Sequence, residues 1–163
     1  MSATYYPCVA RVESSNVFFL WFTNDIDGVH LEDGDLLTFD SISDCLGFAM
    51  SRNFSMGDRE PTLFEIDPIW QWLQTFDCGT VDPLMLLNIW NLIEDFLRSR
   101  APNNDPFPLA KCGVYDKLFW ASNLPAVTPP GQRFDPEWST DERREIATIL
   151  TEPFSEFRGA LLR

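Results

Sequence analysis

The chain has 163 residues, of which 45% are hydrophobic and 14% aromatic, enough to form a core and to argue against wholesale disorder. Its net charge of −13 argues against nucleic acid and anionic membranes as partners, because both would repel it. The charge is uneven: residues 1–97 carry 16 acidic side chains and three arginines, whereas residues 98–163 carry nine of each sign.

The expected compartment is the cytoplasm. No stretch approaches the roughly 20 apolar residues that a membrane-spanning helix needs. The N-terminal residues lack the basic and apolar regions of a signal peptide. The four cysteines form no C-x-x-C pair, so we expect reduced thiols and no zinc knuckle. They are Cys8, Cys45, Cys78 and Cys112.

The first part of the chain predicts an antiparallel β-meander. Cys8–Val12 has the pattern of a short edge strand, and the continuous apolar run Asn16–Thr23 that of a strand buried on both faces. A turn rich in Asp and Gly at residues 24–28 leads to a short strand at residues 29–31. A second such turn at residues 32–35 leads to another short strand at residues 36–39.

A helix is expected next, opened by Ser41 with Asp44 three residues later. Its expected inner stripe is Ile42, Cys45, Leu46, Ala49 and Met50. Thr62–Ile66 has the pattern of a strand, and Asp67-Pro68 that of a helix start.

The segment Asp82–Arg100 predicts the central buried helix of the fold. Asp82 can cap its first amides, and Pro83 suits the first helical position. Apolar side chains cover most of its circumference, so it must be packed on several sides. A polar edge remains at Asn88, Asn91, Asp95 and Ser99.

The C-terminal part is expected to be mainly helical. Val114–Trp120 fits a strand or a short helix, and the proline-rich segment Pro125–Pro136 should lie against the body through Val127 and Phe134. Ser139 opens a final helix with a capping box, which Pro153 should kink or restart. The sequence thus predicts a single α+β domain over residues 1–163, β-rich over about 1–66 and helical over about 67–163.

No catalytic motif is present, so we expect no enzyme activity and no cofactor. His30 is the one histidine, and neither a G-x-S-x-G elbow nor a glycine-rich phosphate loop occurs. The D-x-D pairs at 25/27 and 33/35 could share a divalent ion in a hydrolase, or could simply be solvated turns. The EF-hand pattern is not matched, and we predict no metal site.

Seven carboxylates fall within twenty residues that contain no lysine or arginine. Such a run either keeps the protein soluble or forms a docking surface for a cationic protein. The predicted partner-binding residues are Asp25, Asp27, Glu32, Asp33, Asp35, Asp40 and Asp44. A second interpretation is an adaptor that binds a peptide through the aromatic and proline-rich segment 115–138, with Trp120 and Trp138 as contacts.

Three segments carry a resemblance to a known family: FLWFTNDIDG, LLNIWNLIEDFLRS, and YDKLFWASNLPAVTPPG followed by PEWSTDE. Over about residues 16–150 the chain resembles small acidic bacterial immunity proteins of polymorphic or contact-dependent growth inhibition toxin systems. The resemblance implies tight binding of one cognate toxin domain, expected to be a basic nuclease, and occlusion of its active site or substrate groove. It transfers no catalytic residues.

Overall fold

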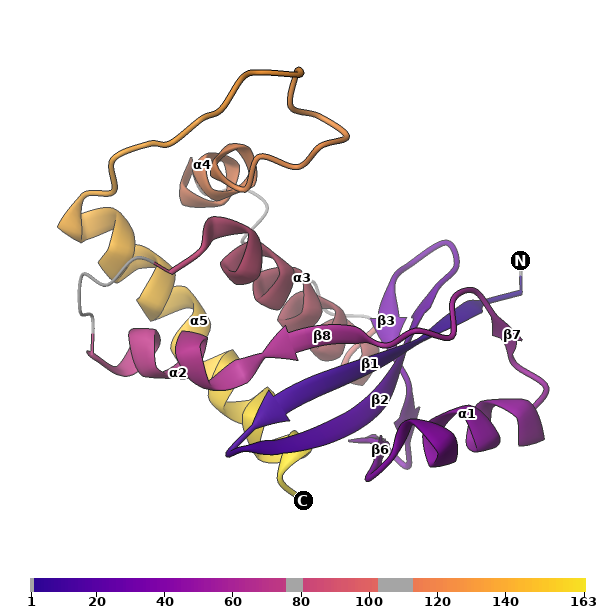
Figure 1. Cartoon of the computed structure of the whole chain (residues 1–163). Coiled ribbons are helices and arrows are strands. Elements are labelled where there is room, and N and C mark those ends of the chain that lie inside the picture. The colour runs from indigo at the N-terminus through magenta and orange to yellow at the C-terminus, as the bar shows by residue number, and fades with distance from the viewer. Residues whose placement is uncertain (1, 76–80, 103–112) are drawn as a thin grey trace.

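Helices pack around a six-stranded sheet in the computed structural model, which describes residues 2–75, 81–102 and 113–163 (Figure 1). The α+β class and the N-terminal meander are confirmed. Strands β1 (Thr4–Val12), β2 (Ser15–Thr23) and β3 (Gly28–Val29) pair antiparallel in that order. Glu13 and Ser14 join the first two strands with φ values of 48° and 65°, the left-handed backbone that a two-residue hairpin turn requires.

The prediction that Cys8–Val12 is an edge strand is wrong. On the side away from β2, β1 pairs in parallel with β7 (Ser55–Met56) and β8 (Thr62–Glu65), so the sheet is mixed. These pairings cover residues 4–5 and 8–11 of β1 and leave Pro7, which has no N–H to donate, in the gap between them.

The two short strands expected after β2 are each divided. Strand β4 (Leu31–Glu32) forms a separate hairpin with β5 (Asp35–Leu36), and β6 (Thr38–Phe39) returns to β2. The predicted turn lies at Asp33 and Gly34, whose φ values are 54° and 87°.

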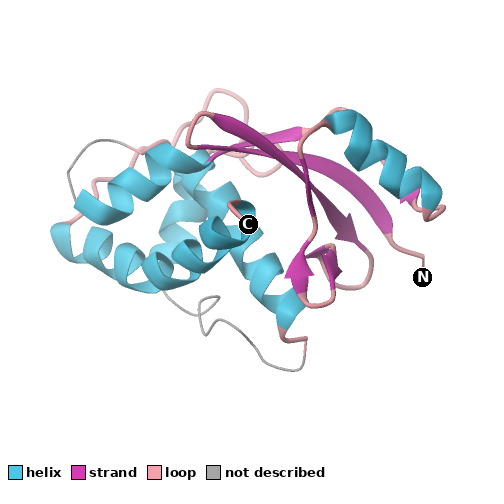
Figure 2. Cartoon of the chain, turned by 90° about the horizontal axis from the view of Figure 1, so that it is seen from below, coloured by secondary structure: helices cyan, strands magenta, loops and turns pink. Residues whose placement is uncertain are grey.

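Both faces of the sheet are covered, as the apolar run in β2 predicts. Phe19 and Leu20 are each fully buried, although consecutive side chains in a strand point to opposite faces. Leu20 packs with Cys45 and Ala49 of α1 (Ile42–Ser51), while Phe19 belongs to the larger core on the other face. Figure 2 shows α1 separated from the other helices by the strands.

Helix α1 begins as predicted, with the Asp44 backbone N donating to Ser41 Oγ over 3.1 Å. The expected inner stripe is only partly right, because Met50 is 63% exposed. Cys45 and Ala49 lie four residues apart and face the sheet, and Met50 lies about 100° further round the helix.

Helix α2 (Ile66–Thr75) begins at Ile66, which was expected to end the preceding strand. The Asp67 carboxylate does not take the expected capping role. Instead, it accepts a hydrogen bond of 2.9 Å from the Glu13 backbone N in the β1–β2 turn, which attaches the start of α2 to the sheet.

Helix α3 (Pro83–Arg100) is the central buried helix that the sequence predicts. Asp82 caps it by accepting from the Leu84 backbone N over 2.9 Å. It packs against β3, β8, α4 and α5. Its fully covered side chains are Leu86, Leu87, Ile89, Trp90, Leu92, Ile93 and Phe96.

Segment 113–121 forms helix α4 (Gly113–Ala121), which decides between the two structures that the sequence left open. The following segment is held by Asn123, whose amide exchanges hydrogen bonds of 3.0 and 2.8 Å with the backbone of Phe134. The expectation that Val127 and Phe134 anchor this segment is wrong, since both side chains are exposed.

The predicted capping box opens helix α5 (Thr140–Leu161), with Ser139 and Glu142 bonding each other's backbone N. The helix continues through Pro153 and does not restart there. Among the described residues, no helix is long and apolar enough to cross a membrane.

Candidate functional site

All seven predicted docking carboxylates are exposed, but the fold distributes them over three places. Two lie in the β2–β3 turn, three in or beside the β4–β5 hairpin, and two around the start of α1. In that order, they are Asp25 and Asp27; Glu32, Asp33 and Asp35; and Asp40 and Asp44.

Distant parts of the chain supply cations that the local sequence lacks. Arg52 pairs with Glu32 over 2.7 Å, and Arg163 pairs with Asp35 over 3.0 Å. Asp44 accepts from the Ser41 hydroxyl over 2.7 Å. The five carboxylates without an ion-pair partner among the described residues are Asp25, Asp27, Asp33, Asp40 and Asp44.

The acids therefore form no single cluster. Glu32 binds Arg52 at the C-terminal cap of α1, whereas Asp44 lies in its first turn. A ten-residue helix is about 15 Å long, beyond the screening length of about 8 Å at physiological salt. Charges at its two ends act on a partner separately.

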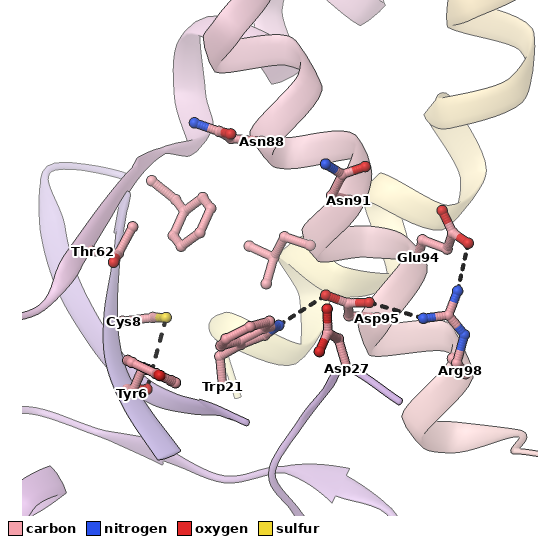
Figure 3. Close-up of a pocket in the computed structure, with 12 residues that line it drawn as sticks. Tyr6, Cys8, Trp21, Asp27, Thr62, Asn88, Asn91, Glu94, Asp95 and Arg98 are labelled. Atoms are coloured by element: carbon pink, nitrogen blue, oxygen red, sulfur yellow. Dashed lines mark hydrogen bonds and ion pairs between the residues drawn. The ribbon is translucent and has the colours of Figure 1, made fainter. Parts of the chain in front are cut away.

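One of the seven, Asp27, also lines a cavity of about 480 Å³ between the sheet and α3 (Figure 3). We call this cavity the β1–α3 pocket. Its walls come from β1, β2, β8, α3 and the β2–β3 turn, and combine aromatic, amide and charged side chains. They are Tyr6, Cys8, Trp21, Asp27, Thr62, Phe64, Asn88, Asn91, Leu92, Glu94, Asp95 and Arg98.

Asp95 is the least exposed carboxylate of this pocket, with a side chain 14% exposed. The Trp21 indole Nε1 donates to its Oδ2 over 2.8 Å, and Arg98 Nη1 donates to its Oδ1 over 3.0 Å. Burial raises the pKa of Asp95 to about 6, and the charges of Asp27 and Glu94 add to the increase. The two donors oppose it only in part.

Arg98 is the single cation in the lining. Its Nη2 donates to Glu94 Oε1 over 2.5 Å, so one guanidinium bridges the carboxylates of Glu94 and Asp95. The carboxylate of Asp27 lies next to that of Asp95 in Figure 3. With three carboxylates ionised against one arginine, the pocket carries a net charge of −2.

The β2–β3 turn is fixed against α3, so these carboxylates have defined relative positions. The Val29 backbone N donates to Ser99 Oγ over 2.8 Å, and Ser99 Oγ donates to the Asp95 carbonyl over 2.8 Å. A Cβ atom at Gly28 would lie 2.5 Å from Ser99 Oγ and 2.7 Å from the ring of Phe22. Only glycine allows this approach after Asp27.

The pocket offers hydrogen-bond acceptors rather than a nucleophile. Burial raises the pKa of the Cys8 thiol to about 12, so it stays protonated at neutral pH. His30 lies outside the lining, among the rings of Tyr5, Phe48 and Phe54, and burial lowers its pKa. Within the described ranges, no three His, Cys, Asp or Glu side chains are placed to hold a metal ion.

The sequence interpretation missed the pocket, although it contained a signal for it. Asn88, Asn91 and Asp95 form the polar edge of a helix that is otherwise buried, with the three- and four-residue spacing of one face. A polar edge on a covered helix has to meet polar groups or a cavity. Which of the two it meets depends on β1 and β2, far away in the sequence.

A second hollow, of about 420 Å³, lies between α4 and the segment that follows it. Two of its aromatic side chains are exposed, Trp120 at 52% and Phe134 at 47%. Trp138, the other predicted adaptor contact, does not line it but is half-buried, with the Lys117 Nζ 5.0 Å from its ring centroid. Of the two predicted tryptophans, Trp120 lines this hollow and Trp138 does not.

No protein-family model, curated protein or solved structure matches this chain. The resemblance to immunity proteins therefore stays a prediction.

The Asp95→Asn variant should reveal the cost of the buried charge as a pH dependence. A raised pKa in the folded state favours the protonated form, so Asp95 stabilises the fold at low pH and this stabilisation is lost as the pH rises through about 6. The free energy of unfolding of the wild type should fall by about 2 kcal/mol relative to Asp95→Asn between about pH 4.5 and about pH 7.5. Urea unfolding of both proteins at both pH values measures this change. A difference in unfolding free energy that stays the same at the two pH values would contradict the prediction.

Proposed function

We propose that the chain is a cytoplasmic, non-catalytic immunity protein that binds and neutralises a cationic toxin domain. A nuclease is the expected class, blocked at its active site or substrate groove. The observation that carries the proposal is the meeting of carboxylates from two distant segments, Asp27 with Glu94 and Asp95, at one cavity that contains a single arginine.

Electrostatics favours a cationic protein as the partner. A nuclease binds phosphates through lysines and arginines, so its substrate groove is positively charged. An acidic surface accelerates encounter with such a groove and disfavours wrong partners. The five exposed acids without an ion pair among the described residues supply long-range attraction, and the pocket supplies close contacts. Asp27 in the β2–β3 turn contributes to both, and Asp25 in the same turn contributes to the long-range attraction.

Co-expression tests this function. We expect the reading frame directly upstream to encode a large secreted protein with a basic C-terminal domain. Producing that domain alone should arrest growth, and adding this chain should restore growth and yield a complex that copurifies. Continued arrest in the presence of the folded chain, with no complex, would refute the proposal.

An adaptor that binds a peptide is the alternative, and the hollow beside Trp120 and Phe134 favours it. Exposed aromatic side chains of this kind often anchor a peptide. The Trp120→Ala variant separates the two functions. If it abolishes partner binding while charge reversal in the β2–β3 turn does not, the adaptor is the correct description.

A further inference from the structure

We propose that the β1–α3 pocket binds the guanidinium group of an arginine side chain from the partner. The inference rests on the proposed function in that the arginine belongs to the cationic protein. The pocket is large enough for a side chain, since about 480 Å³ lies within the usual range of ligand cavities.

Unused acceptors face this cavity. Arg98 occupies one oxygen of Glu94 and one of Asp95, and the Trp21 indole occupies the other oxygen of Asp95. Within the described residues, neither Glu94 Oε2 nor the Asp27 carboxylate takes part in a hydrogen bond. Asp27 and Asp95 repel each other, and a cation placed between them would relieve that repulsion.

The walls favour guanidinium over ammonium. The rings of Tyr6 and Trp21 lie with their centroids 5.5 Å apart, and Phe64 adds a third aromatic side chain. Guanidinium is planar, weakly hydrated and able to stack on such rings, whereas an ammonium group retains its water more strongly. Arg98 already shows that Glu94 and Asp95 accept a two-pronged donor.

Other ligand classes fit less well. The net charge of −2 in the lining disfavours phosphate, sulfate and carboxylate ligands. A divalent cation would need several converging oxygen ligands, and no such group of three occurs in the described part of the chain. An apolar ligand would cover the Asp27 carboxylate and Glu94 Oε2 without offering either a hydrogen-bond donor.

Titration of the full chain with a small probe tests the site without any partner protein. The probe is Nα-acetyl-arginine methylamide, and its neutral isostere is the corresponding citrulline derivative. The indole N–H of Trp21 reports binding by nuclear magnetic resonance, because it donates to Asp95, a carboxylate of the pocket lining. Its signal is assigned with Trp21→Phe. We expect a saturable shift with the arginine probe, a much smaller one with the lysine derivative, and none with citrulline.

Two variants with the same charge change distinguish binding of the probe in the pocket from attraction by the overall negative charge of the protein. Asp27→Asn removes a pocket carboxylate, whereas Asp33→Asn removes an exposed one outside the lining. Asparagine tolerates the left-handed backbone at position 33. The first variant should weaken the probe about tenfold, because it loses a charge-assisted hydrogen bond, and the second less than about twofold. Equal weakening by both, an equal response to lysine or citrulline, or no saturation would overturn the inference.

The two proposals can fail independently. Saturable binding of the arginine probe together with failed co-expression would leave the guanidinium site standing and remove the immunity function. If the chain neutralises a toxin domain but does not bind the arginine probe, the immunity function stands and the guanidinium site is refuted.

Discussion

Replacing Asp25 and Asp27 by lysine should slow association with the cationic partner by about 100-fold at low salt, because electrostatic steering changes on-rates by roughly 10- to 1,000-fold. The double variant changes the charge of one exposed turn by four units, next to the pocket carboxylates. The wild-type on-rate should also fall steeply as salt is added, whereas that of the variant should not. Stopped-flow mixing over a series of salt concentrations measures both.

Reversal of Asp25 and Asp27 tests docking without breaking an ion pair among the described residues. Reversing Glu32 or Asp35 would also break the ion pairs with Arg52 and Arg163, so a loss of binding could reflect a change in structure. Asp25 and Asp27 make no ion pair within the ranges that the structure describes, and both are exposed.

A matched control lies on the exposed side of α5. Glu145→Lys with Glu152→Lys makes the same four-unit change at two exposed positions that form no ion pair with any described residue. If association depends on the β2–β3 turn, this control should retain most of the on-rate. An unchanged on-rate for Asp25→Lys with Asp27→Lys would refute electrostatic docking at the turn. Equal slowing in the control would mean that the effect comes from the net charge of the protein and not from the turn.

Local interactions account for what the sequence predicts correctly. Ser41, Asp82 and Ser139 each cap a helix through a backbone N two or three residues away, so the pattern is readable within one short segment. The β4–β5 turn is likewise set by Asp33 and Gly34 alone. The central helix 82–100 follows from its own apolar coverage.

Contacts between distant segments account for what the sequence does not predict. The parallel pairing of β8 with β1 joins residues more than fifty positions apart, and no local pattern marks it. The pocket needs Asp27 to meet Asp95, which requires the whole sheet to be placed on α3. The same holds for Arg163, whose pairing with Asp35 spans 128 positions and neutralises a predicted docking acid.

The placement of the sheet on α3 and α5 depends on Phe157, and the Phe157→Ala variant should lose about 3–5 kcal/mol of unfolding free energy. Phe157 is fully buried and contacts two other rings edge-on, that of Phe19 at 6.0 Å and that of Phe96 at 5.2 Å between centroids. These contacts join β2, α3 and α5. Because domains of this size have about 5–15 kcal/mol of total stability, the loss is large.

Two variants calibrate this result in urea unfolding. Phe157→Leu keeps most of the buried volume and should lose only about 1–2 kcal/mol. Phe134→Ala removes the same kind of side chain from an exposed position and should lose less than about 0.5 kcal/mol. A loss below about 1 kcal/mol in Phe157→Ala would mean that sheet and helices do not share one core.

The same variant links the core to the pocket. Phe19 precedes Trp21 by two residues on β2, and Phe96 follows Asp95 on α3. Loosening the three-ring contact should therefore let the Trp21–Asp95 hydrogen bond open more often, and exchange of the Trp21 indole proton with solvent should accelerate in Phe157→Ala before global unfolding. If that proton stays as protected as in the wild type, the pocket is held by the β2–β3 turn and Ser99 rather than by the core.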